Sequence, residues 1–422
     1  MGRGYFTKVR VTDFGPYVTK IILPLPEKMK KDPDKDSFSV YVERRDSHGE
    51  IMQLPKNWLE QDKREPSAGY CTVRDCYMAN LEGERTDGGN CIALEMAYGP
   101  MNALAAEISA PDGFNISIIS DYRITQVKAV ETEKGKLSGL VFDKKFGTKC
   151  TDYRDFCESV SHDPKCPLRY GYYIPQGKAE KKPLIIWLHG AGEGGEETKI
   201  AYMGNKVTAM AAPGIQDAFD GCCLFVPQCP TMWLDDGSHE YGRTGRSMYT
   251  EALKSAIDEF LDIEPCIDRS RIYIGGDSNG GFMTMRMCID YPDFFAAAFP
   301  VCEALYDETI SDEQIRILSG LPIWFVHAKN DPVVLPAETV DATYRRLQKA
   351  GAQNLHFSFF DRIVDIHEGW TGEDGRPFEY IGHFAWIPLF NRDCNFDYDG
   401  SPVLTDGKKT DVFDWLAQQR KA

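Results

Sequence analysis

The first part of the chain consists of short segments in which apolar and polar residues alternate. Such alternation predicts β-strands with one buried face, and the Gly, Pro, Asp and Asn residues between the segments predict turns. Residues 1–150 are therefore expected to form an all-β sandwich. The clearest segments are YVTKIILPL (17–25), SFSVYVERR (37–45), CIALEMAY (91–98), FNISIIS (114–120) and YRITQVKAV (122–130).

A different pattern begins near residue 165, where strand-like and helix-like segments alternate. Strands that alternate with helices of about ten or more residues predict βαβ units and a mostly parallel sheet. Residues 165–422 are therefore expected to form a separate α/β domain. The expected strands are 168–175, 183–190, 222–228, 271–278, 294–302, 322–331 and 355–361, and the expected helices are 247–262, 280–292, 337–351 and 411–420.

Composition narrows the class of protein. The chain has 422 residues, more than one typical domain. Its formal net charge of −16 argues against nucleic-acid and membrane partners, because both need a basic surface. No apolar run is long enough for a transmembrane helix, and the N-terminal residues lack the apolar core of a signal peptide. The 13 cysteines have no regular spacing, which indicates buried thiols in a reducing, cytoplasmic setting.

The stretch LIIWLHGAGEGG (184–195) contains a predicted strand and matches GxGxxG at Gly190, Gly192 and Gly195. In a dinucleotide-binding domain this pattern opens a helix, and an acidic residue at the end of the next strand binds the ribose. Here the next strand, CCLFVPQCP (222–230), ends without a carboxylate. The sequence therefore argues against nucleotide binding at this loop.

A second glycine-containing turn has the pattern of a nucleophile elbow. The segment RIYIGGDSNGGFMTM (271–285) contains GxSxG, with Ser278 between a predicted strand and a predicted helix. Such a turn strains the serine backbone, and side chains at Gly276 and Gly280 would collide with neighbouring backbone. The amide dipoles of the following helix favour negative charge beside the hydroxyl. Ser278 is the candidate nucleophile, with a simple glycine-rich turn as the alternative.

A serine hydroxyl needs a general base, and the base needs a group that orients it. Asp331 follows the apolar segment PIWFVHA (322–328), and His383 lies in YIGHFAW (380–386), before the last predicted helix. The chain order serine, aspartate, histidine is the one that α/β-hydrolases use. Asp331 and His383 are therefore the candidate orienting acid and general base.

Other histidines compete for the role of the base. His367 is the main alternative. We favour His383, because Gly382 permits a tight turn and because the spacing from His383 to the C-terminal helix is suitable. His327 and His356 lie inside apolar, strand-like runs, where we expect a core or strand-edge role.

Six segments after residue 165 together resemble the esterase-like branch of the α/β-hydrolases, near the prolyl oligopeptidase, dienelactone hydrolase and polyhydroxybutyrate depolymerase-like groups. The resemblance covers about residues 165–422 and implies a doubly wound, mostly parallel sheet. The β-rich residues 1–150 resemble the immunoglobulin-like domain that precedes the hydrolase in some bacterial esterases. The six segments are LRYGYYIP, LIIWLHGAGEGG, VPQCP with Trp233, IGGDSNGGFMT, WFVHAKNDPVV and IGHFAW.

The resemblance assigns a role to the HGAG loop as well. It implies an oxyanion hole in which the amide of Ala191 donates together with the amide of Asn279, with Gly192 as the alternative to Ala191. The glycines then serve the close approach of backbone to a substrate carbonyl. His189 is expected to brace this loop through its ring nitrogens.

Substrate recognition is harder to predict. Trp233 and Trp386 are candidates to line the substrate pocket, with core packing as the alternative. Glu193, Glu196 and Glu197 could hold a peptide amine, although a solvated loop or first helical turn is the favoured interpretation. The pocket is expected to be built by loops whose conformation the sequence does not determine: 196–220, 230–248 and 302–320.

Together these residues predict a serine carboxylic-ester hydrolase that acts on small acyl or aryl esters through an acyl-enzyme. A serine peptidase acting on short peptides is the alternative, and a non-catalytic binding protein with this fold is a third. Residues 1–150 are too few for the propeller of oligopeptidases and show no blade-length repeat. No metal or organic cofactor is expected, and DYDG (397–400) lacks the other ligands of a calcium loop. The oligomeric state stays open, a homo-oligomer included.

Overall fold

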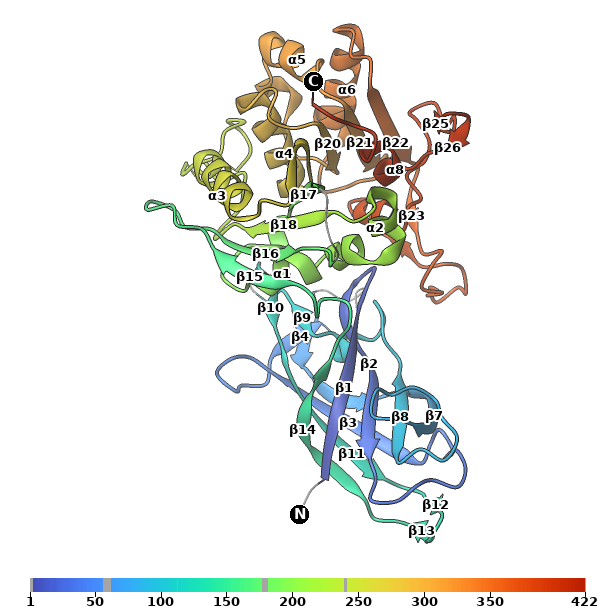
Figure 1. The fold of residues 1–422 in the computed structure, drawn as a ribbon. Coiled ribbons are helices and arrows are strands. Elements are labelled where there is room, and N and C mark those ends of the chain that lie inside the picture. Colours follow the sequence, from blue (N-terminus) through green and yellow to red (C-terminus); the bar gives the residue numbers. More distant parts are fainter. Residues whose placement is uncertain (1–2, 56–61, 112, 177–180, 239–240, 422) are drawn as a thin grey trace. The chain divides into compact units, whose positions relative to one another are not determined.

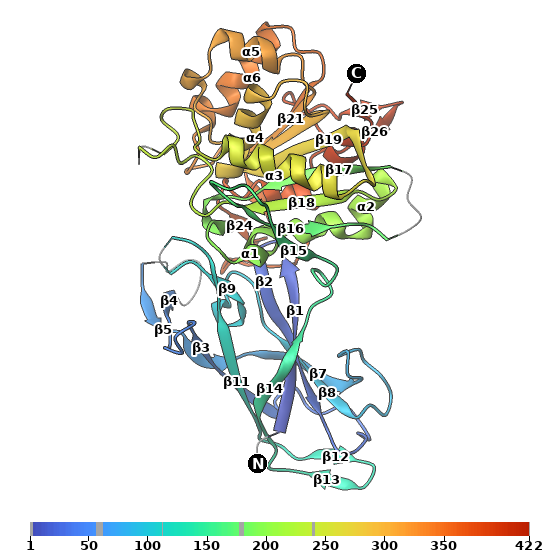
Figure 2. The same ribbon diagram turned by 60° about the vertical axis from the view of Figure 1, so that its left-hand side comes forward.

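Two units make up the part of the chain that the structure describes, and each has its own hydrophobic core. The computed structural model describes residues 3–55, 62–111, 113–176, 181–238 and 241–421. The units are Met1–Arg154 and Asp155–Ala422, and Figure 1 and Figure 2 show them from two directions. Apolar side chains of the first unit form one large buried cluster, and those of the second unit form another.

Eight strands of the first unit follow the hydrogen-bonded order β6-β3-β11-β14-β1-β2-β8-β7. Only the pair β1 and β14 in this order is parallel. This pair joins two four-stranded halves. The strands are β1 (Arg3–Thr12), β2 (Gly15–Pro24), β3 (Phe38–Arg45), β6 (Ala68–Cys71), β7 (Val73–Ala79), β8 (Cys91–Met96), β11 (Ile119–Gln126) and β14 (Val141–Lys149).

Alternating side chains build the core of this first unit. In β3 the buried apolar residues are Phe38, Val40 and Val42, and the residues between them are half-buried. A period of two places one face of a strand in the core. Ile21 of β2 and Leu94 of β8 reach the same core from the other half. The predicted all-β sandwich is confirmed.

The first unit also contains short elements outside its main sheet. They are two-stranded ribbons and one helical turn: β4 (Gln53–Pro55) with β5 (Arg64–Pro66), β9 (Ile108–Ser109) with β10 (Ile116–Ser117), β12 (Val130–Thr132) with β13 (Gly135–Leu137), and η2 (Ala103–Ala105).

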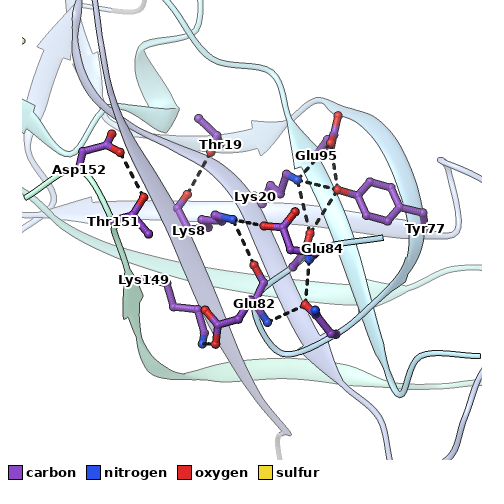
Figure 3. A network of polar contacts seen from close by, with 12 residues as sticks. Lys8, Thr19, Lys20, Tyr77, Glu82, Glu84, Glu95, Lys149, Thr151 and Asp152 are labelled. Carbon is purple, nitrogen blue, oxygen red and sulfur yellow. Dashed lines mark hydrogen bonds and ion pairs between the residues drawn. The ribbon is translucent and has the colours of Figure 1, made fainter. Parts of the chain in front are cut away.

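One surface of the sandwich carries a network of polar contacts (Figure 3). Lys8 donates to Glu84 over 2.6 Å, and Lys20 donates to the hydroxyl of Tyr77 over 2.7 Å. The contact between Lys8 and Glu84 is an ion pair, and surface ion pairs add little stability. The residues labelled there include neither serine nor histidine.

The second unit contains the sheet β15-β16-β18-β17-β19-β20-β21-β22. Neighbours from β18 to β22 are parallel, and β15 and β16 add an antiparallel edge. The predicted mostly parallel sheet is confirmed. The strands are β15 (Cys157–Val160), β16 (Arg169–Tyr173), β17 (Lys182–Leu188), β18 (Cys223–Gln228), β19 (Ile267–Asp277), β20 (Ala297–Val301), β21 (Ile323–Ala328) and β22 (Leu355–Phe360).

Helices cover both faces of this sheet, which explains why its central strands are apolar throughout. Ile186 of β17 packs in the cluster that contains Phe260 of α3. The next residue, Trp187, points to the other face, where its ring lies 4.9 Å from the ring of Phe390 in α7. A strand buried on both faces reads as a continuous apolar run.

The helices of the second unit are α1 (Thr198–Met203), α2 (Pro213–Phe219), α3 (Thr250–Ile263), α4 (Asn279–Asp290), α5 (Asp312–Leu318), α6 (Val340–Lys349), α7 (Trp386–Phe390) and α8 (Val412–Leu416). Short turns and ribbons complete it: η3 (Ala191–Glu193), η4 (Val207–Ala211), η5 (Asp307–Thr309), η6 (Pro336–Glu338), β23 (Ile363–Val364) with β24 (Glu379–Tyr380), and β25 (Leu404–Thr405) with β26 (Lys408–Lys409). The segments expected only as loops therefore contain α1, α2 and α5.

Candidate active site

The candidate nucleophile lies at a sharp turn between β19 and α4. Ser278 has φ +54° and ψ −114°, a positive-φ conformation that residues with a side chain rarely adopt. Its N–H donates to the carbonyl of Val301, at the end of β20, over 2.9 Å. This strained strand-to-helix turn is the geometry expected of a nucleophile elbow.

The glycines around Ser278 allow backbone to touch backbone. A Cβ at Gly276 would lie 2.4 Å from the carbonyl oxygen of Leu188, and a Cβ at Gly280 would lie 1.9 Å from the same atom. Carbon and oxygen atoms that are not bonded cannot approach so closely. The elbow therefore packs directly against the end of β17, from which the HGAG loop begins.

His189 braces this loop, as expected. Its Nδ1 donates to the carbonyl of Gly190 over 2.6 Å, and its Nε2 accepts from the N–H of Cys229 over 2.9 Å. Burial lowers the pKa of His189 to about 4. The ring is neutral near pH 7, and backbone groups occupy both of its nitrogens.

The two candidate oxyanion amides begin helical segments. Ala191 is the first residue of η3, and Asn279 is the first residue of α4. The first N–H groups of a helix have no intrahelical acceptor, so they are available to a negatively charged oxygen. A Cβ at Gly280 would also lie 2.8 Å from the carbonyl oxygen of His189, so the first turn of α4 touches the start of the loop that leads to Ala191.

The candidate acid and base are joined by a hydrogen bond. Asp331, just after β21, is buried, and its Oδ2 lies 2.8 Å from Nδ1 of His383. Its Oδ1 accepts from the N–H groups of Val333 and Val334 over 2.8 and 3.1 Å. Burial acts to raise the pKa of Asp331, but hydrogen bonds from His327 and His383 outweigh burial and hold it well below its usual range. Asp331 is therefore an oriented carboxylate.

Gly382 explains how His383 reaches Asp331. A Cβ at Gly382 would lie 2.7 Å from the backbone nitrogen of Asp331, so only glycine lets the two loops touch. The competing His367 lies elsewhere, because its Nε2 is 2.9 Å from Asp393 and its side chain is 40% exposed. Of these two histidines, the structure brings His383 to Asp331.

The nucleophile and the acid lie at the same edge of the sheet. Ser278 follows β19 and Asp331 follows β21, and β20 lies between these parallel strands. Cys302, directly after β20, is buried beside both. Burial first, and then the charges of Asp277 and Asp331, raise the pKa of the Cys302 thiol well above its usual value. The elbow and Asp331 therefore lie at the carboxyl ends of two parallel strands that are separated by one strand, β20.

Two buried carboxyl groups lie beneath the HGAG loop. The amide nitrogen of Asn205 donates to Asp277 over 2.9 Å and to Glu193 over 3.4 Å. A Cβ at Gly190 would lie 2.7 Å from a carboxyl oxygen of Asp277. Burial first, and then the charge of Glu193, raise the pKa of Asp277 well above its usual range. We refer to Asp277, Glu193 and Asn205 as the acid cluster.

The acid cluster changes the interpretation of the glutamates after the loop. Glu196 and Glu197 are exposed, in agreement with a solvated segment. Glu193 lies in the helical turn η3, as one form of that interpretation expected, but its side chain is buried and not solvated. Its carboxylate contacts Asn205 because η3 turns the side chain inward.

The two candidate pocket tryptophans are both buried. Trp233 is fully buried, and its ring lies 5.4 Å from the ring of His189. Trp386 opens α7, and its ring lies 4.5 Å from the ring of Phe384. These contacts favour core packing for Trp233, and a substrate-binding role of either residue stays a prediction.

Sequence reasoning missed one partner of Asp331. His327 is buried in β21, as expected for a core residue, but its Nε2 lies 2.9 Å from Oδ2 of Asp331. A histidine four residues before an aspartate, across the end of a strand, is the signal that could have revealed this contact. The site therefore contains two imidazoles on one carboxylate.

Neither a metal site nor a membrane-spanning helix is found in the described part of the chain. There, His, Cys, Asp and Glu side chains do not gather in a group of three that could hold a metal ion. In the same residues, every helix is too short or too polar to cross a bilayer.

A serine at a strained turn between a strand and a helix of a mostly parallel sheet defines an α/β-hydrolase, a class of serine hydrolases. The family comparison agrees with this class. Residues 171–364 match the family described as Phospholipase/Carboxylesterase, and residues 5–139 match the Esterase Ig-like N-terminal domain. The chain therefore combines an esterase immunoglobulin-like domain with a carboxylesterase-type hydrolase domain, which confirms the resemblance stated above.

Individual relatives match different shares of the chain. A poly(3-hydroxyalkanoate) depolymerase C of Paucimonas lemoignei is 29% identical over 142 residues, which are 32% of this chain and 31% of that protein. A feruloyl esterase B of Neurospora crassa is 30% identical over 135 residues, 31% of this chain and 42% of that protein. The chain thus spans less than half of either relative. A solved thermostable esterase has the same fold over 99% of both chains, with a TM-score of 0.75 and 22% identity.

The acid cluster generates a prediction about stability. The pKa of Asp277 is raised in the folded protein, so the folded state binds its proton more tightly than the unfolded state does. The free energy of unfolding should therefore fall as the pH rises above the unfolded value of about 3.9 and level off above the folded pKa. Asp277→Asn cannot ionise and should lose less stability between pH 5 and pH 8, as measured by urea unfolding.

Asp361→Asn is the matched control. Asp361 is exposed, and its hydrogen bond with Lys329 lowers its pKa, so its removal should not flatten the curve. If the free energy of unfolding changes with pH by the same amount in Asp277→Asn and in the wild-type protein, the assignment of a raised pKa to Asp277 is contradicted.

Proposed function

We propose that the protein is a serine carboxylic-ester hydrolase that acts on small acyl or aryl esters. The observation that carries the proposal is the 2.8 Å hydrogen bond between Asp331 and His383, at the sheet edge where Ser278 occupies its strained turn. A serine, a histidine and a buried carboxylate at one edge are the groups that acyl transfer through serine requires.

The proposed mechanism has two halves. The Ser278 oxygen attacks the ester carbonyl while Nε2 of His383 takes the hydroxyl proton. The bond to the alcohol then breaks, and His383 gives the proton to the leaving oxygen, so that an acyl-enzyme forms. Water attacks the acyl-enzyme with His383 again as the base, the bond to the Ser278 oxygen breaks as His383 returns the proton to that oxygen, and the acid leaves. Asp331 accepts the Nδ1–H of His383 throughout and stabilises the imidazolium.

The oxyanion of each tetrahedral intermediate is proposed to bind the amides of Ala191 and Asn279. Both residues begin helical segments, where N–H groups point outward along the helix axis. Donors fixed before the reaction need no reorganisation when the negative charge develops. The brace formed by His189 supports this role, because it holds the loop through backbone contacts on both ring nitrogens.

Ester substrates are favoured over peptides. One curated relative is named a feruloyl esterase, and one family model is named for phospholipases and carboxylesterases. A peptidase that anchored an amine with Glu193 would need that side chain at the surface, and it is buried. If the protein were a peptidase, the exposed Glu196 and Glu197 would be the residues that bind the peptide amine.

The proposed setting is the reducing cytoplasm, and the proposed partner is a small-molecule ester. All 13 cysteines are free in the structure, which supports a compartment that keeps thiols reduced. Half of the cysteines of the first unit and most of those of the second unit are buried, as expected for packing residues.

Ser278→Ala should lower kcat for a p-nitrophenyl acyl ester by about five to six orders of magnitude without unfolding the protein, because the three residues act as a unit. A fluorophosphonate should label the wild-type protein at Ser278 and leave the variant unlabelled. Ser401→Ala changes an exposed residue that follows a turn and should keep both properties. More than about a tenth of the wild-type activity in Ser278→Ala would contradict the assignment.

The two histidines can be ranked by the same assay. His383→Ala should abolish turnover, whereas His367→Ala should keep most of it, because His367 is bonded to Asp393 and not to Asp331. Wild-type activity should fall on acidification, since a protonated imidazole cannot take the serine proton. The measurement is kcat/KM against pH for the three proteins. The reverse ranking would make His367 the base.

The ester and peptide hypotheses differ in leaving group. An amide nitrogen leaves less readily than an alkoxide, so a peptidase must hold both sides of the bond and deliver the proton accurately. We expect kcat/KM for short-chain or aryl esters to exceed that for matched aminoacyl anilides by at least about a hundredfold, or roughly 2.7 kcal/mol. A panel of p-nitrophenyl esters and p-nitroanilides measures this ratio.

Glu196→Gln and Glu197→Gln serve as controls for the ester and anilide panel. Both side chains are exposed, and neither change should alter the ratio. Equal values for the two substrate classes, together with loss of anilide turnover in either variant, would favour the peptidase.

A further inference from the structure

The carboxylate of Asp331 contacts a second imidazole that the proposed mechanism does not use. Nε2 of His327 lies 2.9 Å from Oδ2 of Asp331, and Nδ1 of His383 lies 2.8 Å from the same oxygen. The side chains of His327 and Asp331 are both fully buried. One carboxylate oxygen therefore serves two histidines.

The contacts of His327 define where its proton lies. Nε2 is close to the carboxylate oxygen and, at 3.2 Å, to the carbonyl oxygen of Val334. Both oxygens only accept hydrogen bonds, so Nε2 carries the hydrogen. Nδ1 is buried and has no hydrogen-bond partner among the residues that the structure describes. Burial lowers the pKa of His327, so the ring is a neutral Nε2–H donor.

We infer that His327 is a positioning residue that holds Asp331 toward His383 and limits how strongly Asp331 attracts the proton of the catalytic imidazole. The inference rests on the proposed function, since it concerns the same acid and base. Two backbone N–H groups fix Oδ1 of Asp331, and His327 fixes Oδ2. The carboxylate therefore cannot turn away from His383 when the imidazole becomes charged.

The second part of the inference follows because His327 and His383 share one oxygen of Asp331. Two donors on one oxygen divide its negative charge, so each hydrogen bond is weaker than it would be alone. Without His327, Oδ2 would interact more strongly with a protonated His383. His383 would then keep its proton to a higher pH and act as a base over a narrower range.

The other titratable groups near this pair come from neighbouring strands. Cys302 follows β20, and Asp277 ends β19, and burial is the first cause that raises the pKa of each well above its usual range. Glu303, next to Cys302, has a pKa raised by burial to about 8. All three groups are retained in every variant compared below, so a change in the acidic limb of activity is assigned to the substitution of His327.

The test compares two substitutions of His327. Methionine keeps much of the side-chain volume and removes the donor, whereas glutamine places an amide N–H near the position of Nε2. For His327→Met we expect kcat to fall about tenfold, and the midpoint of the acidic limb of kcat/KM for p-nitrophenyl acetate to rise by about half to one pH unit. His327→Gln should keep the wild-type limb and most of the activity.

His356→Met is the matched control. His356 lies on the neighbouring strand β22 and bonds Asp397 over 2.8 Å, so it too is a strand histidine on a carboxylate. Its loss should leave the acidic limb in place. Fluorophosphonate titration of active sites corrects each rate for the amount of folded enzyme. If, after this correction, the midpoint of the acidic limb of kcat/KM is the same in His327→Met as in the wild-type protein, the inference is overturned and His327 is a packing residue.

A second variant and a second readout keep the test decisive. If His327→Met does not fold, His327→Asn replaces it, because asparagine places its amide near Nδ1 and not near Nε2, and the same upward shift is expected. If the wild-type protein has no esterase activity and no fluorophosphonate label, the proposed function fails separately. The low-field proton resonance of His383 Nδ1–H then decides: a shift in His327→Asn supports shared bonding, and an unchanged resonance overturns it.

Discussion

Backbone contact between the end of β17 and the turn around Ser278 is the constraint on which the site depends. Side chains at Gly276 or Gly280 would meet the carbonyl of Leu188 at 2.4 or 1.9 Å, so only glycine allows the contact. The chain after Leu188 becomes the loop that carries Ala191, whereas Gly280 belongs to the first turn of α4. Because close-packed interiors transmit displacement, this contact holds the nucleophile and the candidate oxyanion amides in one arrangement.

Such close packing also buries acidic side chains around the elbow, and their surroundings decide which of them is charged. Burial is the first cause that raises the pKa of Asp277, where Glu193 adds a second acid nearby. Burial likewise raises the pKa of Glu303 to about 8. Asp331 is buried too, but N–H groups from two histidines and two backbone amides surround its oxygens. Hydrogen bonds to the charged form therefore lower the pKa of Asp331, whereas the pKa values of Asp277 and Glu303 are raised.

Local patterns in the sequence were sufficient to predict several central strands and to propose the three candidate catalytic residues. Apolar runs predicted β17, β18, β19 and β21 to within about four residues at each end, and GxSxG with the chain order proposed Ser278, Asp331 and His383. Helices α1, α2 and α5 have 6, 7 and 7 residues, too short to show a helical period. The contacts of His327 and of Glu193 escaped prediction because they depend on which strands and loops become neighbours in the folded chain.

A histidine beside a carboxylate does not by itself identify a general base in this chain. His367 bonds Asp393 over 2.9 Å, almost as closely as His383 bonds Asp331 over 2.8 Å. The difference is burial, since the side chain of Asp393 is 29% exposed and that of Asp331 is 0% exposed. A carboxylate shielded from water acts more strongly on an adjacent imidazolium. In the structure, two observations favour His383. Its partner Asp331 is buried, and Asp331 lies at the same edge of the sheet as Ser278. Sequence spacing alone shows neither.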